Sequence, residues 1–594
     1  MRRQLGGRAR ACGLSIALSL AMVGGPVASA SAQASPPAPR SVSTSPTKAT
    51  GQGDPAPLAL PPTDSEIRQN TPPACRGYSS MGSVANWRSG VVTDPVSKDT
   101  FPVGKSDIDW TVDPNRSPSW LIQFHGLAWV RGLLDHFRMT GDAVSFQQAL
   151  AVLRDHARDN RPGAPTHRSA WTDHAVSLRL TTYACFAAVA PVPADLLPVF
   201  EQAAAWQLTP RNYRARHNHG LMQNISLVRL GCEVGRLDWI DGAWSRMASD
   251  LRAAVDDQGA NNEQSSWYAL FNVTQWELGL ASVADCGTMF AKTPTAREVI
   301  ARVGQLHGFV QHLTQPDGLL AVIGDTTADK AGLLDRTDLP LGSLYRAGYA
   351  TGRSAWGDPK AMHWTLRFGP ARDKHGHEDH MSVTYYVDGG RVLTEGGHAG
   401  YDQGADRDYI RSPLAHNAPI VPGKRFRPGV VTPLLNHTTT PERTLVTVKD
   451  DAYGTSRSRS LVAATRERML ATFDRGGGGP VITPWLVDPA LTATVVAPGK
   501  VLLTGPRTAT LSFFDAASCA PLTAAVESGT IGMGWRDYRP TNRVTVRSRG
   551  TVTVVSPGDA TATCTRSGGS ALISVTTGPS SVVFTAQDNG ILRG

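Results

Sequence analysis

Two histidine-rich segments far apart in the chain contain residue types that could do chemistry. In the first, residues 216–220, Asn218 and His219 stand side by side. An amide and an imidazole together can donate hydrogen bonds to a carboxylate. A helix-capping Asn beside a surface His explains the same pair equally well. The second segment, residues 375–382, opens a strand-rich half of the chain, so the two segments predict one site where two domains meet.

The second segment has the alternation expected of a β-strand. Alternate residues of a strand share one face, so His375, His377 and Asp379 are expected to point the same way. Glu395 follows at the end of a strand, and His416 comes soon after it. Together these residues supply nitrogen and oxygen ligands over roughly forty positions, in a number suited to zinc.

Two tyrosines accompany these clusters. Tyr268 follows a polar, glycine-containing loop that also holds Glu263, and it could project into a cleft. Taken alone, such a tyrosine is more often a core or surface aromatic. Tyr401 follows Glu395 in a loop.

Two kinds of domain must position these residues. Over residues 78–352 apolar residues recur every three or four positions, as in Trp120, Phe124 and Leu127, which predicts many helices with short connections. Residues 381–387 and 391–394, joined by Asp388-Gly389-Gly390, predict a β-hairpin. Later alternation of apolar and polar residues predicts an all-β module, most simply a sandwich.

The N-terminus has the features of a secretory signal. Four arginines precede an apolar stretch over residues 13–23, too short to span a bilayer, and overlapping A-x-A sites follow it. We therefore expect a signal peptide over residues 1–34 and a secreted protein. A Pro-, Ser- and Thr-rich linker over residues 35–77 is expected next, then a helical domain over 78–352 and a β-sandwich over 353–594.

Cysteines and charge restrict the partners. Six cysteines remain after the signal; Cys519 and Cys564 could pair, and buried thiols are the alternative for those of the helical region. The signal holds four arginines and no acid, so the formal charge of +9 falls to +5 without it. This mild excess fits an anionic polymer and lacks the dense basic patch of a nucleic-acid binder. We expect neither nucleic acid nor a membrane as a partner.

Several motifs stand in the order of a known family. They are Thr140-Gly141-Asp142; Trp171 with Arg179; Asn218-His219-Gly220; Asp257, Glu263-Gln264-Ser265 and Tyr268; Pro316-Asp317-Gly318 with Gly324-Asp325; His375-Gly376-His377, Asp379 and Met381-Ser382; and Ala415-His416-Asn417. In these motifs the chain resembles the heparinase II/III and alginate lyase type of polysaccharide lyase. The resemblance implies a multidomain α+β fold, an incomplete (α/α) toroid followed by an antiparallel β-sandwich, with the active site in the cleft between them.

The resemblance also implies a reaction, which is β-elimination across C4–C5 of a uronic acid residue. Asn218 and His219 would neutralise the substrate carboxylate and so stabilise the enolate-like intermediate. Tyr268 would give a proton to the departing O4, with His375 and Tyr401 as partners on the sandwich side.

Substrate and metal ligands follow from the same motifs. Glu263, Arg179 and Arg411 become candidates for binding an anionic polysaccharide such as alginate, heparan sulfate or a related glycosaminoglycan. The resemblance further implies a structural zinc held by His377, His416 and a third ligand that is usually Asp. Glu395 takes that third place here, and its longer side chain changes the geometry. No organic cofactor is expected.

Two other functions fit the sequence less well. A glycoside hydrolase of the same helical architecture needs two catalytic carboxylates, for which Glu263, Asp325 and Asp379 are available. A secreted carbohydrate-binding protein with an inactive site is the second alternative. Products separate the enzymes, because a lyase makes an unsaturated uronate whereas a hydrolase adds water.

Overall fold

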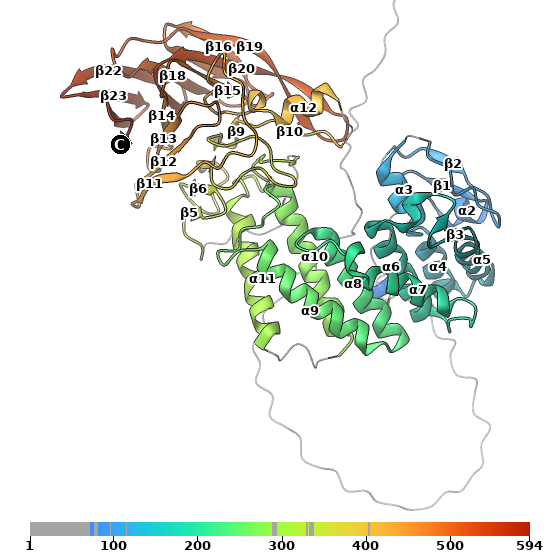
Figure 1. The fold of residues 1–594 in the computed structure, drawn as a ribbon. Helices are drawn as coiled ribbons and strands as arrows, with labels where there is room; N and C mark the ends of the chain where they lie inside the picture. The colour runs from blue at the N-terminus through green and yellow to red at the C-terminus, as the bar shows by residue number, and fades with distance from the viewer. Residues whose placement is uncertain are drawn as a thin grey trace, which may run out of the picture. The chain divides into compact units, whose positions relative to one another are not determined.

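The structure, a computed structural model, describes residues 72–594 except 76–80, 96, 115, 288–293, 328–330, 332–337 and 402–403. The predicted signal peptide and all but residues 72–75 of the predicted linker lie outside the described residues. The described chain forms two compact units, residues 72–207 and 208–594, and each is treated by itself. Figure 1 gives the order of the elements along the chain.

The first unit is mainly helical. Its α-helices are α2 (Val84–Arg88), α3 (Pro118–His125), α4 (Val130–Thr140), α5 (Ala143–Asp159), α6 (Asp173–Val189) and α7 (Leu197–Leu208). Helix starts and ends follow the local sequence: Ser117 caps α3 with Pro118 in the first turn, and Gly141 ends α4 in the left-handed region. A disulfide joins Cys75, in a short 3-10 turn, to Cys185 of α6.

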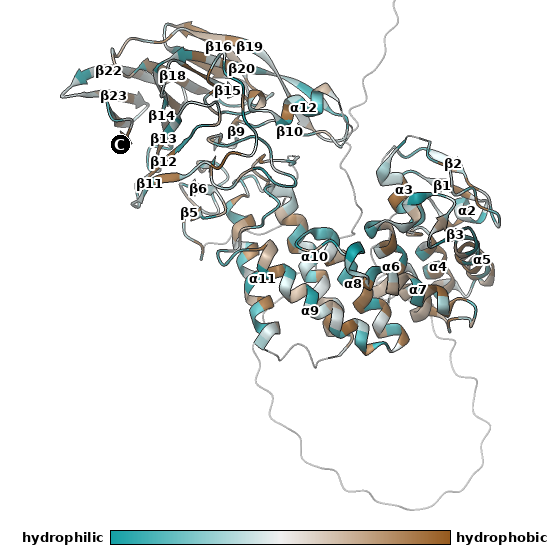
Figure 2. Ribbon diagram, viewed as in Figure 1, coloured by the Kyte–Doolittle hydropathy of each residue, from teal (hydrophilic) through white to brown (hydrophobic). Residues whose placement is uncertain are grey.

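The second unit begins with four long helices. They are α8 (Asn218–Val234), α9 (Leu237–Ala254), α10 (Ser266–Asp285) and α11 (Pro294–His312). Helix α8 packs against α9 and α10, and α10 also packs against α11. Hydrophobic and hydrophilic residues are interspersed along these helices, as amphipathic packing requires (Figure 2). None of the helices among the described residues combines the length and apolarity needed to cross a membrane.

Four sheets follow. A five-stranded antiparallel sheet holds β5 (Gly342–Tyr345), β6 (Tyr349–Arg353), β7 (His363–Arg367), β8 (Val383–Val387) and β9 (Gly390–Leu393). An eight-stranded sheet has the order β11 (Leu434–Thr439), β12 (Arg443–Asp450), β13 (Arg457–Ala464), β14 (Met469–Gly476), β21 (Gly550–Pro557), β18 (Ala509–Asp515), β17 (Lys500–Thr504) and β16 (Thr492–Ala497). A four-stranded sheet holds β10 (Gly397–His398), β19 (Ala524–Met533), β20 (Tyr538–Ser548) and β15 (Val481–Leu486). The last holds β22 (Thr561–Ser567), β23 (Ser570–Thr577), β24 (Ser580–Gln587) and β25 (Leu592–Arg593).

The sheets enclose two apolar cores. One joins the five-stranded, the eight-stranded and the β10-containing sheets, with Trp364, Tyr385 and Trp485 among its largest side chains. The other lies between the eight-stranded and the C-terminal sheets, around Phe473 and Phe584. The β-rich region therefore buries both faces of its largest sheet, as a layered sandwich does.

Several local predictions can be compared with these elements. The hairpin is confirmed: β8 pairs with β9 across Asp388 and Gly389, both at positive φ. The pairing of Cys519 with Cys564 is also found. The strand expected over residues 375–379 is wrong, because this segment is a loop and β8 begins only at Val383. Strand β5 precedes the predicted domain boundary at residue 353, and β6 spans it.

Candidate active site

The first part of the site is fixed at the start of α8. Its cap is His217, whose Nδ1 accepts a hydrogen bond from the His219 amide, so a capping role for Asn218 is wrong. Asn218 instead donates through Nδ2 to Glu263 Oε2 over 2.8 Å. The other Glu263 oxygen accepts from Asn272 Nδ2 of α10 at 3.1 Å. Because Glu263 is fully buried, it orients the Asn218 amide and leaves one amide N–H for another acceptor.

Tyr268 lies near the start of α10, where Ser265 provides the helix cap. Its ring is parallel to the imidazole of His375, with ring centroids 3.4 Å apart. Its hydroxyl lies 2.5 Å from the hydroxyl of Tyr401. Burial raises the pKa of Tyr268 above its ordinary value, so this tyrosine is protonated at neutral pH.

Tyr401 completes the cluster from the loop after β10. Its hydroxyl lies 3.3 Å from His375 Nδ1 as well as beside Tyr268, so two hydroxyls and one imidazole nitrogen form a chain of contacts. The side chain is 44% exposed, which leaves the cluster open to solvent. A ring of His217 also lies 6.3 Å from that of His375, centroid to centroid. The structure thus brings together Asn218, Glu263, Tyr268, His375 and Tyr401 within one compact unit.

A buried carboxylate, Asp325, lies beneath this cluster. One oxygen lies 3.2 Å from His375 Nδ1, and the other lies 2.9 Å from His377 Nε2. Both oxygens contact the Arg407 guanidinium, at 2.6 and 2.9 Å, and Oδ1 lies 3.4 Å from His398 Nδ1. Although burial opposes it, hydrogen bonds from His375 and His377 hold the pKa of Asp325 well below its ordinary value.

Backbone contacts explain how His375 reaches this place. The His375 carbonyl accepts from the Asp325 amide at 2.8 Å, and the His375 amide donates to the Glu263 carbonyl at 3.2 Å. Gly324 has φ of 58°, and a Cβ there would lie 2.4 Å from the Gln264 carbonyl oxygen. A glycine is therefore required at position 324, where the chain passes close to Gln264 and His375.

Four residues of the site escaped the sequence analysis as site residues: His217, Asp325, His398 and Arg407. Asp325 was named in the Gly324-Asp325 motif and as a possible hydrolase carboxylate, without a role in elimination, and His217 only as part of a histidine-rich segment. His398 and Arg407 gave no signal, since no periodicity or spacing links them to Asp325.

The predicted zinc ligands lie together in the sandwich. His377 and His416 are buried with ring centroids 5.4 Å apart, and Glu395 contacts His416 Nδ1. His377 Nδ1 and His416 Nε2 are buried without a hydrogen-bond partner, which suits an additional bound group. Burial lowers the pKa of His377 to about 4, so its ring is neutral as a metal ligand must be. Two imidazoles and a carboxylate are ligand types that zinc takes, but the candidate ligand atoms of these three residues do not all lie within 4.8 Å of one another.

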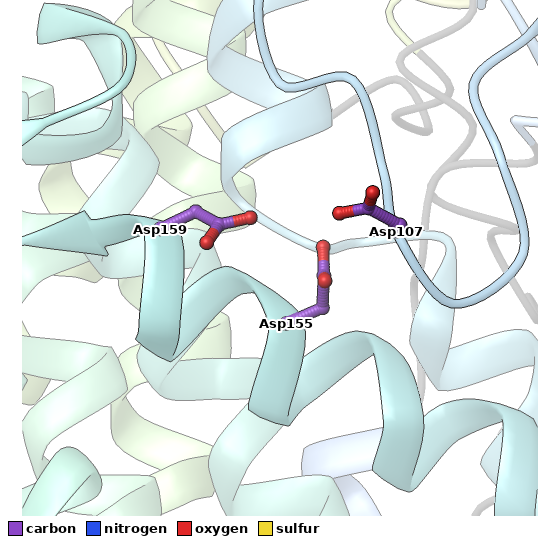
Figure 3. Close-up of side chains that lie close together, drawn as sticks. All are labelled: Asp107, Asp155 and Asp159. Atoms are coloured by element: carbon purple, nitrogen blue, oxygen red, sulfur yellow. The ribbon is translucent and has the colours of Figure 1, made fainter.

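The first unit contains an acidic cluster that resembles a cation site. Asp107, Asp155 and Asp159 point toward one another (Figure 3) and are the one group among the described residues with three candidate ligand atoms within 4.8 Å of each other. Arg158 forms an ion pair with all three. Asp155 also accepts hydrogen bonds from the Ile108 amide and the Trp110 indole. These contacts make the cluster a structural ion-pair network.

The two predicted substrate-binding arginines differ in their surroundings. Arg179 lies in the first unit, fully buried, where it donates to the carbonyls of His125 and Ala170. Arg411 ends α12 (Ala405–Arg411) and is half-buried, with no hydrogen-bond partner for its Nε. Burial and the neighbouring Arg372 and Arg407 lower the pKa of Arg411. An unmatched cation of this kind attracts an anion.

None of the three carboxylates considered for hydrolysis is free. Glu263 is held by two amides, Asp325 by Arg407 and histidines, and Asp379 lies 3.4 Å from Arg367 Nε. All three are at most 3% exposed. A hydrolase needs two carboxyl groups that reach the scissile bond and water, so this geometry favours elimination.

The comparison with protein families decides the class. Residues 336–571 match the family model described as heparinase II/III-like, C-terminal. Residues 336–571 are therefore similar to the C-terminal domain of heparinase II/III-like proteins. The match supports the polysaccharide lyase that the motifs predicted. No curated protein sequence matches this chain significantly.

Solved structures with a similar fold cover most of this chain. The heparan sulfate lyase HepC of Pedobacter heparinus is 15% identical, with a TM-score of 0.65 over 88% of this chain and 90% of that one. Heparinase III is 15% identical, with a TM-score of 0.69 over 82% and 86%. The chondroitin AC lyase of Streptomyces coelicolor A3 is 13% identical, with a TM-score of 0.51 over 90% and 91%. This likeness confirms the predicted fold class, an incomplete (α/α) toroid followed by an antiparallel β-sandwich.

Proposed function

We propose that this protein cleaves a uronic-acid-containing glycosaminoglycan by β-elimination at C4–C5 and leaves an unsaturated uronate. The observation that supports this most is the contact of Tyr268, His375 and Tyr401, with the Asn218 amide oriented beside them by Glu263. Similar folds in lyases of heparan sulfate and chondroitin sulfate support the substrate class.

Elimination must first overcome the weak acidity of the C5 proton, since the adjacent carboxylate is already negative. Donors that neutralise this carboxylate stabilise the enolate-like intermediate, and preorganised donors cost no rearrangement during the reaction. We assign this role to the free amide N–H of Asn218 and to His219. The fully buried Glu263 carboxylate keeps the amide in that orientation.

The two proton transfers are assigned to the remaining groups. Tyr268, kept protonated by its raised pKa, donates to the departing O4. Tyr401 takes the C5 proton while its own hydroxyl proton passes to His375 Nδ1, 3.3 Å away. After product leaves, His375 returns a proton to Tyr401, and Tyr401 passes one to the Tyr268 hydroxyl that it contacts, which restores the starting state.

Arg411 is proposed to bind an anionic group of the polymer. It is half-buried on the same short helix as Arg407, which contacts Asp325. Arg179 was predicted to share this role, but its contacts lie within the first unit.

A structural zinc is proposed at His377, Glu395 and His416. Both imidazoles have an unpartnered buried nitrogen, and Ser382 and the Asn417 amide hold the Glu395 carboxylate in place. A bound zinc would cross-link the loop that follows His375 to the sandwich. None of the proposed proton transfers uses the metal.

Export is proposed from the signal-like N-terminus and is supported by three disulfides, which persist in oxidising compartments.

The test is incubation of the mature protein with a panel of polymers: heparan sulfate, heparin, chondroitin sulfate, hyaluronan and alginate. Ultraviolet absorbance reports the unsaturated product, and reducing ends are counted in parallel. Rising absorbance with a glycosaminoglycan is expected. New reducing ends without absorbance would contradict elimination, and activity on alginate alone would contradict the proposed substrate class.

A further inference from the structure

Four side chains from three segments meet on the Asp325 carboxylate. His375 and His377 belong to the loop before β8, His398 to β10, and Arg407 to α12. Asp325 is 3% exposed, so its charge is compensated by these neighbours and not by water. Arg407 is equally buried and bonds both carboxylate oxygens, at 2.6 and 2.9 Å. Such a two-point contact defines direction as well as distance.

The position of Tyr401 depends on the same carboxylate. In sequence Tyr401 lies between His398 and Arg407, and both of these contact Asp325, His398 at 3.4 Å. The Arg407 guanidinium also lies 5.4 Å from the centre of the Tyr401 ring, and the His398 ring lies 4.8 Å from it, centroid to centroid. Asp325 therefore holds the chain on both sides of Tyr401, while its other oxygen contacts His375.

Asp325 is also held through its backbone. Its amide donates to the His375 carbonyl, and its carbonyl accepts from the Ser265 hydroxyl at the cap of α10. The carboxylate is thus fixed relative to Tyr268, three residues into that helix. One fixed group locates His375 and Tyr401 relative to Tyr268.

We propose that Asp325 is the positioning residue of this active site, which holds His375 and the Tyr401 segment in register with Tyr268. It does not touch substrate. The expected loss of rate rests on the proposed function, whereas the expected shift of His375 and Tyr401 does not. A well-defined active site requires its reacting groups within about half an ångström, so losing such a support costs rate more than binding.

The test uses Asp325→Asn, which keeps the size and removes the charge. We expect kcat to fall about 100-fold, with KM and the affinity for an oligosaccharide product changed less than about threefold. Asp325→Asn combined with Tyr401→Phe should be slowed by less than the product of the two single effects, because part of the effect of Asp325→Asn acts through Tyr401. Asp474→Asn is the matched control. Asp474 is also buried and bonds Arg459 through both oxygens, but it lies in β14 within the sandwich.

A structural readout separates this inference from the proposed function. In a crystal structure of Asp325→Asn, the hydroxyls of Tyr268 and Tyr401 should no longer be in contact, and His375 should have left the face of the Tyr268 ring. Unchanged positions of both residues would overturn the inference, as would a kcat within threefold of wild type. If the wild-type protein cleaves no polymer, the proposed function fails, whereas the crystal structure still decides the role of Asp325.

Discussion

Replacing Tyr268 by Phe tests the assignment of the general acid, because it removes one hydroxyl and little else. The aromatic ring that stacks on His375 at 3.4 Å remains, as does the Ser265 cap at the start of α10. The lost hydrogen bond is the one to Tyr401, worth about 1 kcal/mol of stability. A domain of typical stability tolerates this loss.

The expected effect on rate is much larger. A positioned acid or base contributes a factor of about 10² to 10⁴, so we expect kcat to fall about 1000-fold, equivalent to about 4 kcal/mol. KM should change less than about threefold, because the Asn218 and Arg411 groups proposed to bind substrate are untouched. The rise in activation free energy should therefore be about four times the loss in the free energy of unfolding.

The assay compares initial rates of ultraviolet absorbance on one active polymer, together with thermal unfolding of each variant. Tyr386→Phe is the control, since Tyr386 is buried and its hydroxyl donates a single hydrogen bond, to the Pro359 carbonyl. It should lose similar stability and keep its kcat. A Tyr268→Phe enzyme that keeps more than a tenth of the wild-type kcat would refute the reasoning.

Four further outcomes are expected. Arg411→Gln should raise KM about tenfold on a charged polymer with kcat preserved, and a fall in kcat alone would contradict substrate binding by this residue. Removing the Cys519–Cys564 disulfide, which closes a sequence separation of 45, should cost about 4 kcal/mol in denaturant unfolding. His416→Ala should abolish a near-stoichiometric zinc content in elemental analysis, and wild-type protein without zinc under metal-replete conditions would contradict the metal proposal. Burial lowers the pKa of His363 from its ordinary value of 6.5 to about 3, so between pH 6.5 and 5 only the unfolded state takes up a proton at this residue. The free energy of unfolding should therefore fall by about 2 kcal/mol over this pH range because of His363. His363→Gln should remove that part of the pH dependence.

Local chemistry explains which parts of the fold could be predicted from the sequence. The hairpin of β8 and β9 was predictable because Asp388-Gly389 takes the positive φ values of a tight turn. The start of α8 at Asn218 was predictable from the apolar run after it. Both depend on residues next to each other in the chain.

The segment around His375 shows where such reasoning failed. Alternation of His375, His377 and Asp379 predicted a strand, yet the alternating residues there are polar and the segment is a loop. Its course is set by backbone hydrogen bonds to Glu263 and Asp325, which lie 112 and 50 positions away by residue number. Those contacts leave no periodic trace in the sequence.

The active site likewise contains residues that the sequence indicates and residues that only tertiary packing brings into place. Residue types and motif order indicated Asn218, Tyr268, His375 and Tyr401, which the structure brings together. The burial of Glu263 and the contacts of Asp325 with His398 and Arg407 arise only from tertiary packing. The sequence analysis named Asp325 in a motif and as a possible hydrolase carboxylate, but a carboxylate held between distant segments has no local signature of the contacts that it makes.

The most direct test of the central claim is the mass of the products from a defined uronate-containing oligosaccharide. Elimination predicts two fragments whose masses sum to that of the substrate, with the unsaturated uronate on the fragment that forms the new non-reducing end. Fragments whose masses sum to the substrate plus one water would contradict the account, because they would show hydrolysis at this site.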